Sequence, residues 1–240
     1  MRSKTAWIAV VLLGIGMVLS QYLDFIASPP ERLMGNVVRI MYFHIASATD
    51  AFVAFFVTAL CGVIYLILRI KNAREVMKIW DTVAGASAQI GLLFTTFVLV
   101  TGSIWGRAVW NTWWTWDPTL TTTLILWFLY VGYILLRVSI PDSRRAATVS
   151  AVYGLIAALD VPIIHQSVTW WSGLHPSVIT DSGFNMPDSM VVTLLFSFLV
   201  FLGLYVLLVY MGTALASKRA QIDELRERIR VKLNELDERV

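Results

Sequence analysis

Residues 46–68 read ASATDAFVAFFVTALCGVIYLIL, a run of 23 residues in which the only charged side chain is that of Asp50. A helix needs about 20 consecutive, mostly apolar residues to cross the hydrocarbon core of a bilayer. Arg69 and Lys71 follow directly, as cationic residues do where a span leaves the membrane. The stretch therefore predicts a transmembrane helix.

Five further stretches have the same character, so we expect an all-α polytopic membrane protein with six transmembrane helices. The chain is 58% hydrophobic and only 15% charged, against about 25% charged in soluble domains. We read the first stretch as a retained helix, since it is longer than the apolar part of a signal peptide and no small-residue cleavage site follows. The six predicted spans are Ala6–Leu23, Ala46–Leu68, Thr82–Ser103, Thr119–Leu136, Ala146–Ile164 and Met190–Met211.

The basic residues indicate the orientation. Sixteen of the 19 lysines and arginines fall before the first span, in alternate connections or after the last span. Only Arg32, Arg39 and Arg107 fall on the other side. Because cytoplasmic loops carry the excess of positive charge, both termini are predicted to be cytoplasmic. The outer connections are then about Asp24–Ile45, Ile104–Pro118 and His165–Ser189.

We expect two parts in the chain, a six-span domain over residues 1–213 and a charged cytoplasmic tail over residues 214–240. The tail reads as an amphipathic helix with one narrow apolar stripe and with possible Glu224–Arg228 and Glu235–Arg239 pairs at i,i+4. A solvated or membrane-surface helix is favoured over a specific docking helix. The stripe comprises Ile222, Leu225, Ile229, Leu233, Leu236 and Val240.

Several kinds of chemistry are excluded by motifs that the chain lacks. Its single cysteine, Cys61, cannot form an internal disulfide or a thiolate zinc site, and no C-x-x-C-H is present for covalent haem attachment. No P-loop sequence is present either, so the chain does not itself hydrolyse ATP by that route. The basic residues flank apolar spans and give no nucleic-acid surface.

Five tryptophans fall within twelve residues of the second outer connection: Trp105, Trp110, Trp113, Trp114 and Trp116. An aromatic belt at the membrane interface is one interpretation, although a belt spreads its aromatics over many helix ends. The other is a platform for a flat, π-rich ligand, and the residues alone favour neither. If the segment is helical, Trp110, Trp113, Trp114 and Asp117 share one side.

Other polar residues near this segment have structural and functional readings. Asp117 precedes Pro118 and an apolar run, which predicts an N-cap with proline at the first helical position. Arg107 could pair with a ligand carboxylate or simply be solvated. The three histidines, His44, His165 and His175, all belong to the outer side, where imidazole could ligate haem iron or be an ordinary interfacial side chain. The carboxylates within the spans, Asp50 and Asp160, are costly there, and either could orient a histidine across helices.

The run WGRAVWNTWWTWDPTLT, residues 105–121, resembles the WWD segment of the haem-handling proteins of cytochrome c biogenesis. With six spans and this length, the chain is most similar to the haem exporter protein C family. Two more stretches are similar to that family, RIMYFHIASA at residues 39–48 and PIIHQSVTWWSGLHP at residues 162–176. Thr119 and Asn111 stand where the family commonly has arginine and glycine.

The resemblance implies haem b as the bound group, held in the outer leaflet of the cell's inner membrane between the WWD segment and two axial histidines, His44 and His175. The five tryptophans, Asp117, Arg107 and His165 would complete the site, with Arg107 replacing the missing arginine as a propionate partner. Haem would then pass to a periplasmic haem chaperone. The implied membrane partners are the subunits of an ABC transporter and a small single-span subunit.

This interpretation describes a haem-binding transfer protein without catalytic residues. Two alternatives remain: a haem ligase or lyase that promotes covalent attachment, and a scaffold subunit whose tryptophans only anchor it. The larger lyases share the WWD segment but have many more spans, so the length favours transfer.

The charge distribution predicts the side on which each connection lies. Alkaline phosphatase fused after Thr180 should be active and fused after Ser143 inactive, because that enzyme matures only outside the cytoplasm. The reverse pattern would overturn the orientation and would place the tryptophan segment in the cytoplasm.

Overall fold

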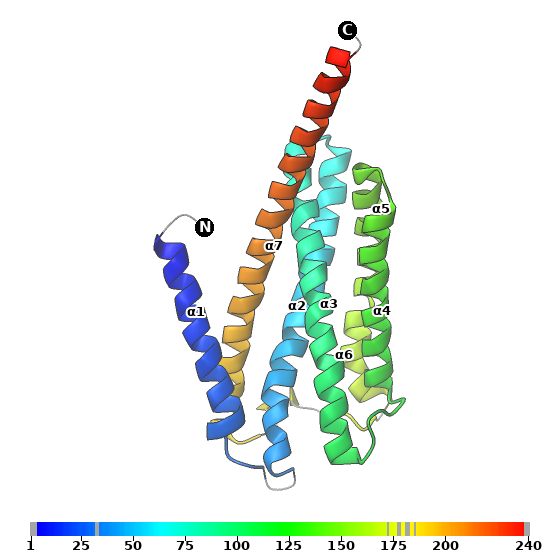
Figure 1. The fold of residues 1–240 in the computed structure, drawn as a ribbon. Helices are drawn as coiled ribbons and strands as arrows, with labels where there is room; N and C mark the ends of the chain where they lie inside the picture. Colours follow the sequence, from blue (N-terminus) through cyan, green and yellow to red (C-terminus); the bar gives the residue numbers. More distant parts are fainter. Residues whose placement is uncertain are drawn as a thin grey trace.

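The computed structural model describes residues 4–31, 34–171, 173–176, 179–180, 183–184 and 186–237, and helices make up most of it (Figure 1). Six stretches are long and apolar enough to cross a membrane: Trp7–Ala27, Asn36–Ile70, Val76–Trp110, Pro118–Ser139, Ser143–Trp170 and Asp188–Asn234. The prediction of an all-α, six-span membrane protein is confirmed. Every backbone polar group in lipid must find a partner within the chain, which a helix provides by itself.

The first two spans are α1 (Lys4–Tyr22), continued by a π-turn over Leu23–Ala27, and α2 (Arg39–Ile70), preceded by a 3₁₀ turn over Asn36–Val38. The third and fourth are α3 (Arg74–Trp110) and α4 (Pro118–Ser139). At 37 residues, α3 is about 55 Å long and extends well beyond a hydrocarbon core of about 30 Å. It therefore carries Trp105 and Trp110 on its last turns.

The fifth span consists of two helices, α5 (Ser143–Ala158) and α6 (Asp160–Trp170), which meet at Leu159. Pro162 explains the break, since its ring lacks an N–H and clashes with the carbonyl four residues earlier, that of Ala158. A short antiparallel pair, β1 (Ile179–Thr180) with β2 (Gly183–Phe184), precedes the last helix.

The last helix, α7 (Asp188–Asp237), runs without interruption from the sixth span into the charged tail. Among the tail pairs, Arg228 and Glu224 form the expected contact, with N and O 2.5 Å apart. The side chains of the expected Glu235–Arg239 pair lie outside the part of the chain that the structure describes. The division at residue 213 remains a prediction, because the helix itself shows no boundary there.

The connections separate into two ends (Figure 1). The α2–α3 and α4–α5 turns, the start of α1 and the end of α7 lie at one end, here called the basic end. The α1–α2, α3–α4 and α6–α7 connections lie at the other, here called the tryptophan end. The connections predicted to carry most of the basic residues thus lie together at one end, and the tryptophan-rich connection lies at the other.

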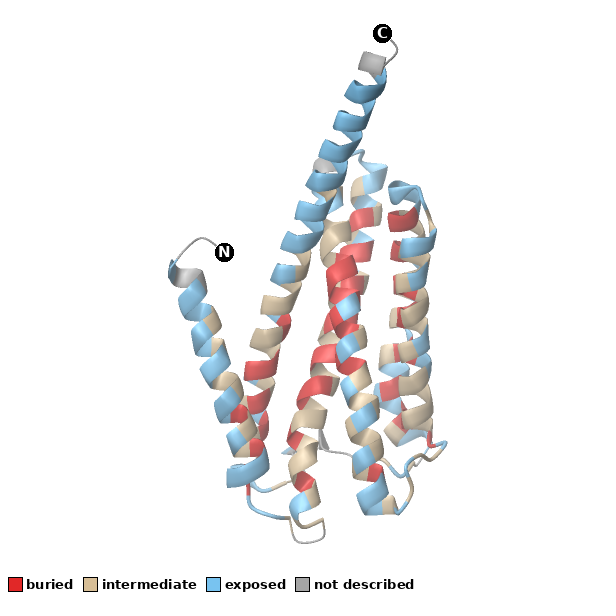
Figure 2. Cartoon of the chain, viewed as in Figure 1, coloured by how far each residue is buried: buried red, intermediate tan, exposed pale blue. Residues whose placement is uncertain are grey.

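Buried residues concentrate where α2, α3, α4, α5 and α7 face one another, whereas outward faces and the tail are exposed (Figure 2). The Phe55 and Tyr130 rings stack at 3.6 Å between centroids. Gly91 permits this close packing, because a Cβ there would lie 2.5 Å from the Phe55 ring. Helix α1 stands apart and packs mainly on α7, where Ser197 donates to Asp24 at 2.6 Å.

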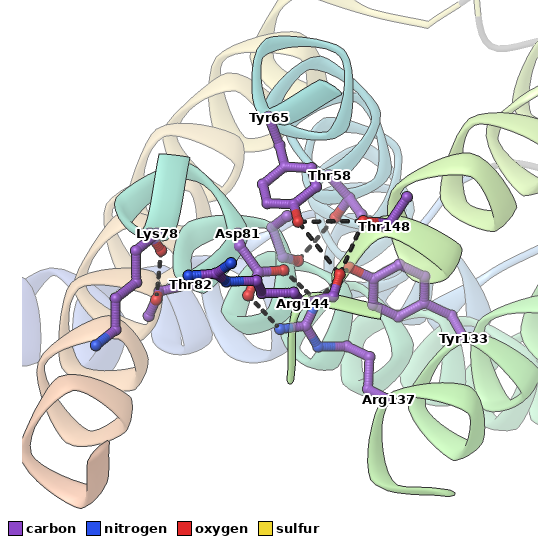
Figure 3. Close-up of polar contacts among 10 residues, drawn as sticks. Thr58, Tyr65, Lys78, Asp81, Thr82, Tyr133, Arg137, Arg144 and Thr148 are labelled. Carbon is purple, nitrogen blue, oxygen red and sulfur yellow. Dashed lines mark hydrogen bonds and ion pairs between the residues drawn. The ribbon is translucent and has the colours of Figure 1, made fainter. Parts of the chain in front are cut away.

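At the basic end, Arg137 of α4 makes a two-bond contact with Asp81 of α3, with N–O distances of 2.6 and 3.0 Å (Figure 3). Its guanidinium also lies 5.8 Å from the centre of the Tyr133 ring. Beside it, Tyr65 of α2 contacts Thr148 of α5 at 3.3 Å (Figure 3). These polar contacts join four helices at the end opposite the tryptophans.

The Arg137–Asp81 pair should stabilise the protein more than a surface pair does. A double-mutant cycle with Arg137→Gln and Asp81→Asn should give a coupling of about 1–3 kcal/mol, because the contact is bidentate and four-fifths shielded. The measurement is thermal unfolding in detergent. Arg228 and Glu224, exposed on the tail, are the matched control, with an expected coupling of about 0.3–0.5 kcal/mol. Equal couplings for the two pairs would contradict the prediction.

Candidate functional site

A cavity at the tryptophan end brings together residues from four separate parts of the chain. It has about 70 Å³ of free space and is lined by Trp105, Trp110 and Trp114 together with His44 and His175. We call it the tryptophan cavity. A second cavity of about 270 Å³ is also lined by His44 and His175, and in addition by His165. We call it the histidine cavity.

The two histidines that line both cavities are held in different ways. His44 lies in the second turn of α2, and its Nδ1 is 3.0 Å from Oγ1 of Thr101 on α3. His175 lies in the connection between α6 and α7, outside any helix. Its Nδ1 is buried and has no hydrogen-bond partner of suitable geometry among the described residues.

Burial lowers the pKa of His175, against the opposing effects of the Pro176 backbone and the Asp117 carboxylate. Its ring therefore stays neutral to a lower pH than that of an exposed histidine. Neutral imidazole is the form that can ligate a metal. At neutral pH, His175 is in the state that a ligand needs.

His165 occupies a different position. It lies on α6 with an exposed side chain, and it contributes to the histidine cavity alone. The structure thus places two of the three histidines beside the tryptophans and the third further away.

The tryptophan segment is helical only as far as Trp110. Asn111 ends α3 in the left-handed conformation, with φ 58° and ψ 22°, and residues 111–117 form no helix. The conditional expectation of a shared helical side for Trp110, Trp113, Trp114 and Asp117 is therefore wrong. Glycine or asparagine suits a left-handed position, which explains how Asn111 can stand where the resembling family commonly has glycine.

This irregular path sorts the tryptophans into two groups. Trp105 and Trp110 pack edge to face at 5.1 Å on the cavity side, together with Trp114. Trp113 and Trp116 are 61% and 76% exposed and do not line either cavity. The predicted aromatic platform thus has three members in the wall and two outside it.

Arg107 lies outside the lining of both cavities. Its guanidinium donates to the Asn111 carbonyl at 2.5 Å and also to the Asn111 side chain. It thereby gives a hydrogen-bond donor to a free carbonyl at the carboxyl end of α3, as a basic residue in the last turn of a helix commonly does. Thr119 does line the tryptophan cavity, and its hydroxyl is 2.7 Å from that of Ser167.

Asp117 connects the tryptophan segment to the connection that carries His175. One carboxylate oxygen accepts from the Thr119 N–H at 3.0 Å, which confirms the predicted N-cap of α4. The other accepts from the Leu174 N–H at 2.6 Å, one residue before His175. A side chain at Gly173 would collide with this carboxylate, so the sequence Gly-Leu-His fits closely against Asp117.

The site offers two histidine side chains, which is enough for a metal that is already held by other ligands, such as the iron of a porphyrin. The described residues contain no group of three or more His, Cys, Asp or Glu side chains that could hold a bare metal ion. Two histidines suffice for a haem iron, which already has four porphyrin nitrogens. The buried Nε1 groups of Trp105 and Trp114 also lack partners among the described residues, and such orphaned donors are unusual in a finished protein interior.

Sequence reasoning missed Met41, Thr101, Gly102 and Pro176. Thr101 could have been found, because it precedes Trp105 by four residues and so lies on the same face of α3. Among the described residues, Asp50 and Asp160 form no hydrogen bond or ion pair with a histidine. Asp50 is fully buried with both oxygens unpartnered among the described residues, and Oδ2 of Asp160 is likewise unpartnered.

Residues 1–228 match the family described as heme exporter protein C, CcmC. The chain belongs to the heme exporter protein C family. It is 37% identical to the heme exporter protein C of Haemophilus influenzae over 84% of this chain and 78% of the relative. The protein of that name from Bradyrhizobium diazoefficiens is 36% identical over 93% and 80%. A putative cytochrome c biosynthesis ccmC-like mitochondrial protein of Marchantia polymorpha is 32% identical over 83% and 82%.

Membership of the heme exporter protein C family implies a role in haem delivery during cytochrome c maturation. The resemblance predicted from the WWD segment is therefore confirmed. The roles of individual site residues remain predictions.

Asp117→Asn should keep one of the two hydrogen bonds that Asp117 accepts, from the Thr119 N–H and from the Leu174 N–H, and lose the other. Asparagine has one acceptor oxygen, so it can serve Thr119 or Leu174 but not both. We expect faster hydrogen exchange over residues 173–176, by about tenfold or more, since hydrogen bonds to charged groups contribute about 1.5–3 kcal/mol. Asp117→Ala should have the same effect and also lower the melting temperature through loss of the α4 cap.

Asp142→Asn is the matched control, because Asp142 caps α5 at the basic end, accepting from the Arg145 N–H at 2.6 Å. Exchange over residues 173–176 should not change in that variant. Unchanged exchange in Asp117→Asn as well would show that the carboxylate does not hold the His175 connection.

Proposed function

We propose that this protein binds haem b at the outer face of the bacterial inner membrane, between His44 and His175, and presents it to a periplasmic haem chaperone. The observation that carries the proposal is the meeting of these two histidines with Trp105, Trp110 and Trp114 around one cavity. Imidazole pairs are common axial ligands of haem iron. The indole rings supply flat apolar surface for the porphyrin.

The free space in the site is smaller than a haem needs. Pockets that enclose most of a drug-sized ligand have about 300–1,000 Å³, whereas the two cavities here have about 70 and 270 Å³. Binding of haem therefore requires the groups around the cavities to move apart.

The remaining polar groups fit the same role. Haem propionates are acceptors, and the unpartnered indole N–H groups of Trp105 and Trp114 are donors. Arg107 could reach a propionate only by giving up its contacts with Asn111. His165 is exposed and away from the tryptophans, so we assign the axial positions to His44 and His175.

The partners are those that the haem exporter family implies: the subunits of an ABC transporter, with a small single-span subunit alongside. The sequence has no P-loop of its own, which is consistent with an ATP-driven step on those subunits. The cytoplasmic basic end would face those subunits' ATPase, and the exposed Trp113 and Trp116 would face the chaperone. No catalytic group is needed for this transfer, which distinguishes it from a haem ligase.

The test is haem content in the purified, detergent-solubilised protein. His44→Gly and His175→Gly should each lose most of the low-spin Soret spectrum, and added imidazole should restore part of it by occupying the vacated position. His165→Gly is the control and should keep its haem. Full spectra in both single variants would refute axial ligation by these residues.

Trp114→Ala and Trp113→Ala form a second matched pair within the same experiment. Trp114 lines the tryptophan cavity and Trp113 does not, so the Trp114 variant should lose apolar contact with the porphyrin and retain much less haem. The Trp113 variant should retain haem but could slow transfer to the chaperone, measured as covalent haem on that protein. Equal retention by both would contradict the division of the tryptophans into wall and exposed groups.

A further inference from the structure

The hydrogen bond between His44 and Thr101 determines which nitrogen of the imidazole is free. Oγ1 of Thr101 lies 2.6 Å from the carbonyl oxygen of Phe97, one turn earlier on α3, and 3.0 Å from Nδ1 of His44. A threonine hydroxyl has one hydrogen to donate. That hydrogen can go to Phe97 or to His44, but not to both.

The carbonyl is the better recipient. Two oxygens at 2.6 Å with no hydrogen between them would repel, whereas a threonine donating to the carbonyl four residues back is a common helical contact. With its hydrogen directed to Phe97, the Thr101 oxygen can only accept from His44. Nδ1 of His44 must then carry the ring proton.

A neutral imidazole protonated at Nδ1 has its lone pair on Nε2. Nε2 makes no hydrogen bond with the described residues, and the ring lines both cavities. The basic nitrogen is therefore the one left for iron. In metal sites the hydrogen bond at one ring nitrogen commonly selects the other for the metal and orients the ring.

The ring is also held sterically. A Cβ at Gly102 would lie 3.1 Å from Cε1 of His44 and 3.7 Å from Nδ1. The imidazole thus packs on the bare backbone of α3, directly beside Thr101. Nδ1 of His175 has no hydrogen-bond partner among the residues that the structure describes, so the two rings differ in how firmly they are oriented.

We propose that Thr101 is a positioning residue for haem ligation: it accepts the Nδ1 proton of His44 and thereby presents Nε2 to the iron. This proposal rests on the proposed function, since it assumes that His44 is an axial ligand. Loss of such a contact commonly lowers metal affinity about 10- to 100-fold. Thr101→Val should therefore weaken haem binding by at least about tenfold, whereas Thr101→Ser, which keeps the hydroxyl, should not.

The decisive experiment uses two small ligands in the His44→Gly protein. Imidazole and 1-methylimidazole both ligate iron through one nitrogen, but only imidazole has an N–H to donate to Thr101. Their affinities for the haem-loaded His44→Gly protein and for His44→Gly/Thr101→Val are measured by optical titration. We expect the second substitution to weaken imidazole binding about tenfold and to leave 1-methylimidazole binding unchanged.

The outcomes are distinguishable. If Thr101→Val weakens both ligands equally, or neither, Thr101 does not act through the ring N–H and this inference is wrong, while axial ligation by His44 stands. If His44→Gly keeps a full low-spin spectrum and does not respond to imidazole, His44 is not a ligand and the proposed function fails with it.

Discussion

The carboxylate of Asp117 makes the contact on which the arrangement of this site depends. Residues 111–117 form no helix, and the described residues between α6 and α7 form only the short β1–β2 pair, so the described parts of these two outer connections lack the continuous hydrogen bonding that makes a helix self-sufficient. By accepting from Thr119 at 3.0 Å and from Leu174 at 2.6 Å, Asp117 starts α4 and holds the neighbouring connection with the same group. Its own burial is tolerable because both oxygens are satisfied.

One side of the site is therefore formed by packed helices, and the other by a connection outside any helix. His44 and the first two cavity tryptophans lie on α2 and α3, which pack closely along their length, with Gly91 allowing close contact. His175 is outside any helix and depends on a contact at the adjacent residue. A residue on such a connection can shift with little cost to the bundle, which is compatible with the proposed binding and release of haem.

The two ends of the bundle differ in how they are held together. The basic end is joined by a bidentate ion pair between α3 and α4 and by hydroxyl contacts between α2 and α5. The tryptophan end has buried polar atoms that lack partners among the described residues, including Nδ1 of His175 and two indole nitrogens. These unpartnered groups at the tryptophan end are available to a ligand bound there.

Much of this molecule follows from its sequence. The lengths of the six apolar stretches determine the number of spans, since each stretch must cover the hydrocarbon thickness, and Asp117-Pro118 marks the start of α4 through local capping chemistry. The WWD segment indicates the family. Pro162 could have indicated a break between α5 and α6. The sequence could not show that Trp113 and Trp116 leave the cavity wall, because that depends on the path of the backbone after the left-handed Asn111.

The partnership of His44 with Thr101, and that of Asp117 with Leu174, join residues 57 positions apart in each case. No local periodicity predicts such a pair, since the relative rotation and height of two packed helices decide which side chains meet. The sequence by itself determined a six-span helical protein and predicted that its five-tryptophan segment and its histidines lie on the same side. Only the tertiary structure decided which two histidines line the tryptophan cavity and which ring nitrogen of His44 is left free, because those outcomes depend on distances of a few ångströms between separate elements.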